Sequence, residues 1–219
     1  MNFIAATVEL RSFIPDPVNA YGLDYRSADA VVPAASSAGE VHFRLLCYDR
    51  AGAKLSAFEG WKPGTRALIT GNIVFSDDTS KPLDLIITTI ETNIPEKMYC
   101  NQVVLGNAFF ASNEIKERKN SQVAVKIGTS LDNSDIVTWL YLETHESRKK
   151  KLNDRIRSGR AICVQGYLRE YRKDDSDSPY RAIVASDFTT RKDREKTSKN
   201  AQTHGSASGY TEIDPTPDY

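Results

Sequence analysis

The sequence predicts an all-β protein with short helices, built as two tandem five-stranded barrels followed by a disordered tail. The main observation is an internal repeat: residues 64–73 read GTRALITGNI, and residues 159–168 read GRAICVQGYL. In each segment an apolar run follows a glycine, and a second glycine comes seven residues after the first. Residues 191–219, in contrast, lack periodic apolar positions and are rich in polar residues, which predicts disorder.

The repeat extends to both sides of these glycine units. A strand-like segment opens each copy, FIAATVEL at residues 3–10 and NQVVLGNAFF at 101–110. Further strand-like runs occupy 41–49 and 136–144, and alternating strands close the copies at 83–92 and 180–190. Before the second glycine unit, Leu152 and Ile156 are four residues apart, the spacing of one helix face. Three strands, a short helix and two strands is the order of an OB-fold.

The repeat sets the expected domain boundaries. We place the first barrel at residues 1–97, the second at 98–193 and the tail at 194–219. The second glycine of each unit, Gly71 or Gly166, suits the sharp bend that a strongly coiled strand needs in a small closed barrel. The stretch from Pro15 to Glu40 is rich in Ala, Ser, Asp and Pro, and we expect it to form a long mobile loop between two strands.

Charge is unevenly divided between the copies although the net charge is zero. Residues 1–97 hold nine Lys and Arg against twelve Asp and Glu, and residues 98–193 hold seventeen against thirteen. The tail holds three against four. If one barrel dominates binding to a polyanion, it should be the second.

The second copy also carries the aromatic side chains that binding of single-stranded nucleic acid requires beside cations. Rings and cations alternate with period two, so they share a strand face. The candidate nucleic-acid-binding residues are Trp139, Tyr141, Tyr167, Arg169, Tyr171, Arg172, Lys173, Tyr180, Arg118, Lys119 and Lys126. Each ring has an alternative role in the barrel core or at its rim. The run Arg148-Lys-Lys-Lys151 is either a phosphate contact or a solvated helix start.

The first copy is poorer in such pairs. Trp61 precedes Lys-Pro-Gly and is expected to pack beneath that turn. The 15–40 loop is open to two interpretations, a segment that clasps DNA or mere decoration. Phe109 and Phe110 are adjacent in the second copy, so we expect one ring to face inward and the other outward.

Residues 99–193 resemble the bacterial single-stranded-DNA-binding protein (SSB) family. The resemblance rests on the opening NQVVLGN, the Thr138-Trp139 strand, Arg157-Ser-Gly-Arg160 leading into ICVQGYLREY, and the closing IVASDF. It implies that Trp139 contacts DNA and that residues 167–173 belong to a hairpin bearing another stacking ring. Residues 1–97 resemble the family more loosely, through GTRALITGN and the last strand.

The resemblance has two further implications. Two barrels in one chain are similar to the tandem-OB SSBs, which implies a homodimer with four OB-folds. The family's tail ends in an acidic tip that recruits replication and repair proteins. This chain ends YTEIDPTPDY, so Glu212, Asp214, Asp218 and Tyr219 are the candidate partner-binding residues, although the acids are few and interrupted by proline.

The remaining expectations concern function classes. The three histidines are isolated, and no catalytic or phosphate-cradling motif stands out, so we expect neither an enzyme nor a cofactor or metal site. Apolar runs are too short for a membrane helix, and three scattered cysteines suit a cytoplasmic protein with reduced thiols. If the chain binds DNA, we expect it to be nucleoid-associated. The leading interpretation is single-stranded DNA binding in replication, recombination and repair. An OB adaptor for protein contacts and an RNA-binding OB protein stay open as alternatives.

Overall fold

The computed structural model describes residues 2–34, 39–48, 50, 52–75, 80–130, 137–171 and 180–190, except for the side chain of Asn107. The first half contains β1 (Asn2–Ala20), β2 (Leu23–Val32), β3 (Val41–Tyr48), α1 (Ala53–Glu59), β4 (Arg66–Val74) and β5 (Leu83–Glu91). The second contains β6 (Asn101–Arg118), β7 (Gln122–Ser130), β8 (Val137–His145), the 3-10 turn η1 (Glu146–Arg148), α2 (Lys149–Arg155), β9 (Ala161–Tyr171) and β10 (Tyr180–Thr190).

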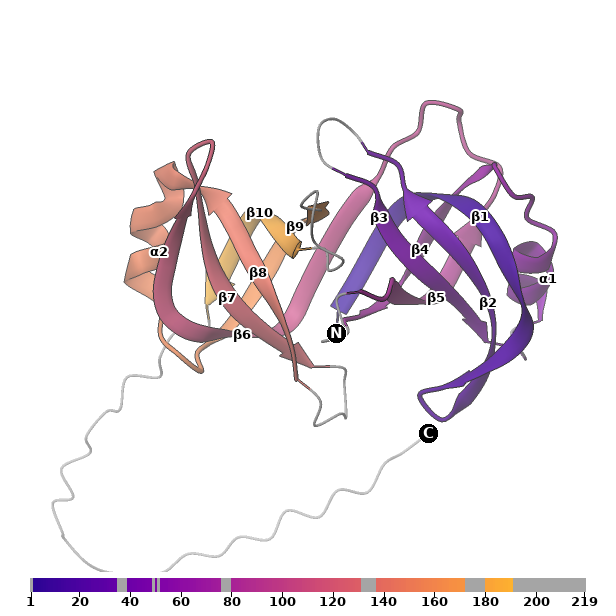
Figure 1. The fold of residues 1–219 in the computed structure, drawn as a ribbon, viewed down its shortest axis with the longest axis horizontal. Helices are drawn as coiled ribbons and strands as arrows, with labels where there is room; N and C mark the ends of the chain where they lie inside the picture. Colours follow the sequence, from indigo (N-terminus) through magenta and orange to yellow (C-terminus); the bar gives the residue numbers. More distant parts are fainter. Residues whose placement is uncertain are drawn as a thin grey trace, which may run out of the picture.

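Each half closes into its own five-stranded barrel (Figure 1). In the first, the ring runs β1-β2-β3-β5-β4 and returns to β1, and in the second it runs β6-β7-β8-β10-β9 and returns to β6. The β3–β5 and β8–β10 pairs are parallel and the other pairs antiparallel. The helix precedes the fourth strand of each barrel, with Phe58 and Leu152 buried against the core. The predicted fold class, two tandem OB-type barrels, is confirmed.

The repeated glycines lie at equivalent and very crowded positions. Gly71 of β4 and Gly166 of β9 each sit beside a register shift in the ladder to the last strand. A Cβ atom would lie 2.2 Å from the carbonyl oxygen of Ile86 at Gly71, and 2.2 Å from that of Val184 at Gly166. Close approach of two backbones at a β-bulge is therefore the reason for glycine at both positions.

The expected loop from Pro15 to Glu40 is wrong for most of its length. Strand β1 continues to Ala20 and pairs with β2 in a long hairpin, and only a shorter β2–β3 connection remains. Tyr21 and Gly22 form the two-residue turn, both with positive φ, as a type I′ hairpin requires. Pro15 and Pro17 fall where the ladder shifts register between Ile14 and Val18. The irregularity accommodates residues without an N–H donor, so proline here did not end the strand.

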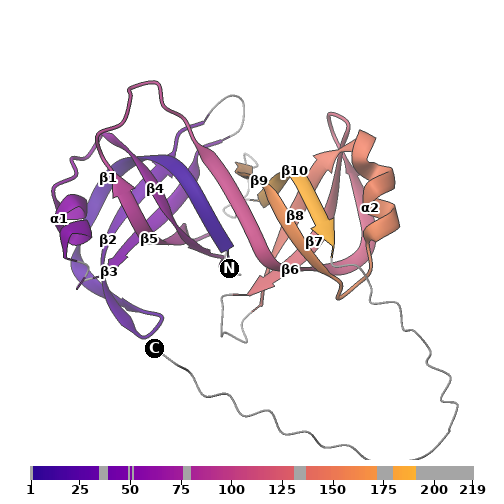
Figure 2. The ribbon, with the colours of Figure 1, turned by 180° about the vertical axis from the view of Figure 1, so that it is seen from behind.

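The two barrels are joined through their first strands, which lie side by side in both views (Figures 1 and 2). Ile4 pairs with Gly71 and Val103 with Gly166, so Ile4 and Val103 are equivalent positions. The same two residues face each other in the antiparallel β1–β6 ladder. The barrels are thus related by an approximate local two-fold axis at this pair.

Polar contacts add to this junction. The Thr138 hydroxyl donates to the carbonyl of Phe75 at 2.8 Å, and both groups are buried. Arg181 forms a buried ion pair with Glu170 at 3.0 Å and also donates to the backbone carbonyl of Lys81 in the first barrel. The second barrel therefore places a desolvated guanidinium against the first.

Trp61 and the adjacent pair Phe109 and Phe110 lie in the environments that the sequence predicts. Trp61 is buried with 3% of its surface exposed, as expected for a ring beneath a turn. Phe110 is fully buried whereas Phe109 is only partly so, which confirms the division expected for adjacent strand residues. In the described part of the chain, no helix is long and apolar enough to cross a membrane.

Candidate nucleic-acid interface

The outer face of the second barrel gathers most of the described candidate residues. On β8, Thr138, Leu140 and Leu142 are buried. Trp139 and Tyr141 alternate with them and therefore project outward. In the neighbouring strand β7, Gly128 lies opposite Trp139 and Lys126 lies opposite Tyr141. On the other side, β10 places Ala182 beside both Tyr141 and Arg169 of β9.

Trp139 is held in place yet remains available to a ligand. Its indole is 42% exposed and meets the ring of Phe109 edge-on, with centroids 5.7 Å apart and planes at 80°. The Lys126 ammonium lies 5.1 Å from its ring centroid. A Cβ atom at Gly128 would come within 2.7 Å of the indole and 2.6 Å of the Phe109 ring. Glycine therefore leaves the space in which the two rings pack.

A tyrosine cluster adjoins Trp139 and is organised by one buried carboxylate. Glu143 is 2% exposed and accepts hydrogen bonds from the hydroxyls of Tyr171 at 2.9 Å and Tyr180 at 3.1 Å. Arg169 donates to the Tyr171 hydroxyl at 2.7 Å, and Arg118 donates to the Tyr180 hydroxyl at 3.2 Å. Each tyrosine thus links an arginine to the same carboxylate, which fixes both rings.

Burial is the largest influence on the acidity of these tyrosines. It raises the pKa of Tyr171 to about 12; the hydrogen bond from Arg169 acts in the opposite direction, and the nearby Glu143 charge adds to the rise. Burial, followed by the Glu143 charge, likewise raises the pKa of Tyr180 well above its ordinary value. Both hydroxyls therefore keep their protons and act as donors near neutral pH.

Further contacts between rings and cations extend the tyrosine cluster around the barrel. Tyr180 lies 4.8 Å from Tyr141 and 5.6 Å from Tyr171, measured between ring centroids. The Arg169 guanidinium lies 5.1 Å from the Tyr171 centroid and 5.9 Å from that of Tyr167, a ring that is 38% exposed. We call this set the aromatic stripe, comprising Trp139, Tyr141, Tyr180, Tyr171 and Tyr167 with the cations Lys126, Arg118 and Arg169. It offers ring faces and positive charge along one path.

Lys119 is the one described candidate that does not join the stripe. Lys119 is exposed in the turn between β6 and β7. Arg172 and Lys173 lie outside the described residues, as do Glu212, Asp214, Asp218 and Tyr219 of the predicted partner-binding tail.

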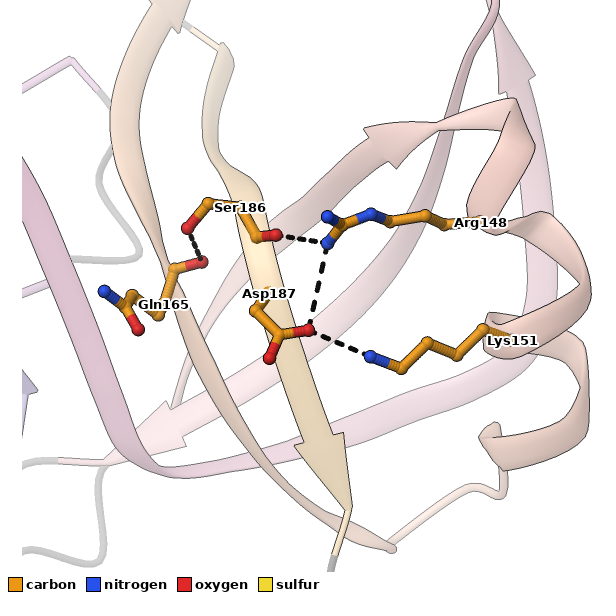
Figure 3. Close-up of polar contacts among 5 residues, drawn as sticks. All are labelled: Arg148, Lys151, Gln165, Ser186 and Asp187. Carbon is orange, nitrogen blue, oxygen red and sulfur yellow. Dashed lines mark hydrogen bonds and ion pairs between the residues drawn. The ribbon is translucent and has the colours of Figure 1, made fainter.

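Three cations of the Arg148-Lys-Lys-Lys151 run are tied down within the barrel. Arg148 and Lys151 converge on Asp187 at 3.8 and 2.9 Å (Figure 3). The Arg148 guanidinium also donates to the carbonyl of Ser186, the extra residue of the β9–β10 bulge, and Lys149 pairs with Glu117 at 2.6 Å. These ion pairs are exposed to solvent, where such pairs contribute little to stability, and the Arg148 contact satisfies a carbonyl group at the bulge.

The equivalent face of the first barrel has a different character. The strand registers place His42 where the second barrel has Trp139, and Asp29 where it has Lys126. Arg44 takes the place of Tyr141 and is held by Asp84 in two hydrogen bonds of 2.6 and 2.7 Å. An acid therefore replaces Lys126, and the exposed ring beside this face is Tyr21, whose hydroxyl donates to Asp84 at 2.7 Å. The pattern of charge at these positions is less suited to phosphates than that of the second barrel.

Sequence reasoning missed three features that shape the interface: Glu143, Gly128 and the contact of the Phe109 ring with Trp139. Because side chains of a strand alternate between its two faces, Glu143 could have been placed on the same face as Trp139 and Tyr141, among cations. No local pattern reveals Gly128, because its importance comes from the register of β7 against β8. The described residues contain no group of three or more His, Cys, Asp or Glu side chains that could hold a metal ion.

Two solved structures are similar to this chain over most of its length. The wild-type single-stranded DNA binding protein from Thermus aquaticus superposes with a TM-score of 0.55 and 14% identity, covering 96% of this chain and 97% of that one. A deletion mutant of the same protein gives a TM-score of 0.57 with 14% identity, covering 87% of this chain and 94% of that one. This chain has the SSB fold. No protein-family model matches the sequence, and no curated protein matches it. The SSB fold was expected most clearly from residues 99–193 and more loosely from residues 1–97, and the superposition covers both barrels.

Proposed function

We propose that this chain binds single-stranded DNA, independently of sequence and without catalysis, on the aromatic stripe of the second barrel. The observation that carries the proposal is Trp139, an exposed indole positioned by Phe109 and flanked by the Lys126 ammonium. Unstacked bases can rest on such a ring while cations hold the phosphates. Bases in a duplex are already stacked on each other, so the stripe favours single strands.

The fold gives independent support. OB-folds bind oligonucleotides on the face formed by their second and third strands, with contributions from the first and fourth loops. In the second barrel these strands are β7 and β8, which carry Lys126 and Trp139. Lys119 in the β6–β7 turn, and Arg172 and Lys173 between β9 and β10, belong to the two loops concerned. We assign these three cations to phosphate contacts.

Tryptophan fluorescence tests the proposal directly. Trp61 is 3% exposed and Trp139 is 42% exposed, so Trp61→Phe leaves one tryptophan in the stripe as the reporter. We expect oligo(dT) to quench it strongly, a duplex of equal length to quench it little, and rising salt to weaken binding. The log–log slope should be about −0.7 for each phosphate neutralised on a single strand.

The controls separate the competing functions. Oligo(rU) of matched length distinguishes a DNA-binding from an RNA-binding protein, since stacking alone does not discriminate the sugars. Equal quenching by single strand and duplex would reduce the interaction to general charge attraction. No binding of any nucleic acid at low salt would overturn the proposal and favour an adaptor that uses its barrels for protein contacts.

The wider role that we propose is protection of single strands during DNA replication, recombination and repair. It rests on the SSB fold and on a second barrel richer in cations than in acids. A cytoplasmic homodimer with four barrels, and recruitment of repair proteins by Glu212, Asp214, Asp218 and Tyr219, are parts of the same proposal. Sedimentation at several concentrations and pull-down with a chain truncated before residue 210 test these two parts.

A further inference from the structure

A groove at the junction of the barrels carries a further proposal, which rests on the proposed function. Its volume is about 260 Å³. One wall comes from the ends of β2 and β3, and the other from β9 and the segment before β6. The lining residues include Val32, Pro33, Val41, Tyr99, Tyr167 and Arg169.

Two rings in this groove are solvent-exposed without an evident structural role. Tyr99 is 46% exposed and Tyr167 is 38% exposed, among the most exposed large apolar side chains of the described residues. Asn101 fixes the wall that holds them, because its side chain donates to the Leu168 carbonyl at 2.9 Å and accepts from the Leu168 N–H at 3.1 Å. Exposed aromatic rings on a fixed wall are suited to binding a flat apolar ligand face.

The groove is continuous with the aromatic stripe. Tyr167 belongs to both, and the Arg169 guanidinium connects it to Tyr171 through contacts of 5.9 and 5.1 Å to the two ring centroids. A strand lying along the stripe from Trp139 therefore reaches the groove at Tyr167. Arg169 supplies positive charge at its entrance, which is complementary to a phosphate backbone.

We infer that this groove receives an unstacked nucleobase of the bound strand, which rests against Tyr99 and Tyr167 with its phosphate near Arg169. The apolar residues Val32, Pro33 and Val41 of the first barrel form the opposite wall. The volume lies just below the roughly 300–1,000 Å³ of sites for larger small molecules, which suits one base better than a bulky cofactor. The first barrel thus contributes to binding through the junction.

The length of the oligonucleotide provides the first test. The affinity of the Trp61→Phe chain is measured by fluorescence for oligo(dT) from about 4 to about 16 nucleotides, the range of site sizes for one OB-fold. Oligomers long enough to extend from Trp139 to the groove should gain affinity. In Tyr99→Ala we expect that gain to fall by about fivefold or more, the lower end for loss of one stacking ring, and in Tyr99→Phe we expect it to persist.

Tyr21→Ala is the matched control, because Tyr21 is also 46% exposed but lies at the β1–β2 turn and does not line the groove. The Tyr21→Ala chain should keep the full gain in affinity as the oligonucleotide becomes longer. Circular dichroism of each variant checks that the fold is retained. Equal gains in wild-type, Tyr99→Ala and Tyr21→Ala chains would overturn the groove site while leaving binding on the stripe intact.

A second readout does not depend on affinity. Oligo(dT) with a single 5-iododeoxyuridine, moved one position at a time, is photo-crosslinked and the modified peptide is identified by mass spectrometry. We expect one position to label Tyr99 or Tyr167 while a distant position labels Trp139. Crosslinks at Trp139 without any at the groove tyrosines would contradict the site. Absence of binding by the wild-type chain would instead overturn the proposed function itself.

Discussion

Gly128 lies directly opposite Trp139 across the β7–β8 ladder, and the space left by its missing side chain is filled by the indole and the ring of Phe109. A Cβ atom there would approach the two rings to 2.7 and 2.6 Å. The glycine therefore determines how Trp139 presents its face to solvent, although it has no side chain to offer a ligand.

Substitution of Trp139 tests the centre of the stripe. We expect Trp139→Ala to weaken binding of oligo(dT) by about 1–3 kcal/mol, the usual value of one base–ring stack. Fluorescence anisotropy of a labelled oligonucleotide measures the change. His42→Ala is the matched control, because His42 holds the equivalent place in the first barrel. An equal loss in both variants would mean that the barrels share binding evenly.

Gly128→Ala should act on Trp139 without harming the fold. The nearest atoms to a new Cβ are the outer ends of two side chains, which can rotate aside. We expect a stability loss near the lower end of the roughly 1–3 kcal/mol that overpacking costs, because the two rings can move. The emission of Trp139 should shift in the Trp61→Phe background, and oligo(dT) affinity should fall. Unchanged emission and affinity would show that the packing of the indole on Phe109 is not needed for binding.

Gly166→Ala is expected to behave in the opposite way. Here the new Cβ would lie 2.2 Å from the Val184 carbonyl oxygen, and the backbone cannot rotate aside as a ring can. Overpacking of this kind costs roughly 1–3 kcal/mol or more, which urea unfolding would detect as a lower midpoint. Gly71→Ala in the first barrel should give a similar loss, since its Cβ would meet the Ile86 carbonyl at the same distance. Wild-type midpoints for both variants would contradict the role of close backbone approach.

The raised pKa of Tyr171 predicts that the folded protein loses stability at alkaline pH. Burial raises the pKa of Tyr171 from 10.0 to about 12. Below pH 10 both folded and unfolded chains keep this proton, so the stabilisation is fully present. As pH rises from about 10 towards 12 the unfolded chain loses the proton first, and the free energy of unfolding falls.

Thermal unfolding between pH 9 and 12 measures this effect, and absorbance at 295 nm follows the ionisation of the phenols. Tyr171→Phe should flatten part of the decline, because it removes one titrating group. The replacement also leaves the Glu143 carboxylate with one donor fewer, so the variant should start from a lower stability at neutral pH. An unaltered slope in Tyr171→Phe would assign the decline to other groups.

The sequence determined the larger features of this protein. Glycines seven residues apart, with matching strands on both sides, predicted two OB-type barrels, and alternation along residues 139–141 and 167–171 predicted which rings share a strand face. These patterns are local, since the direction of a strand side chain follows from its neighbours in the chain. Local reasoning misjudged residues 15–40, because prolines that normally interrupt a strand are accommodated where the β1–β2 ladder shifts its register.

Only the tertiary structure decided which of these residues act together. Register across β7 and β8 placed Gly128 under Trp139, and closure of the barrel brought Glu143 from β8 to Tyr171 of β9 and Tyr180 of β10. The same closure placed Arg148 and Lys151 on the β10 bulge and left Lys126 beside the exposed indole. These contacts join residues from 11 to 38 positions apart, and cross-strand pairing is set by the folding of the whole barrel rather than by any short segment.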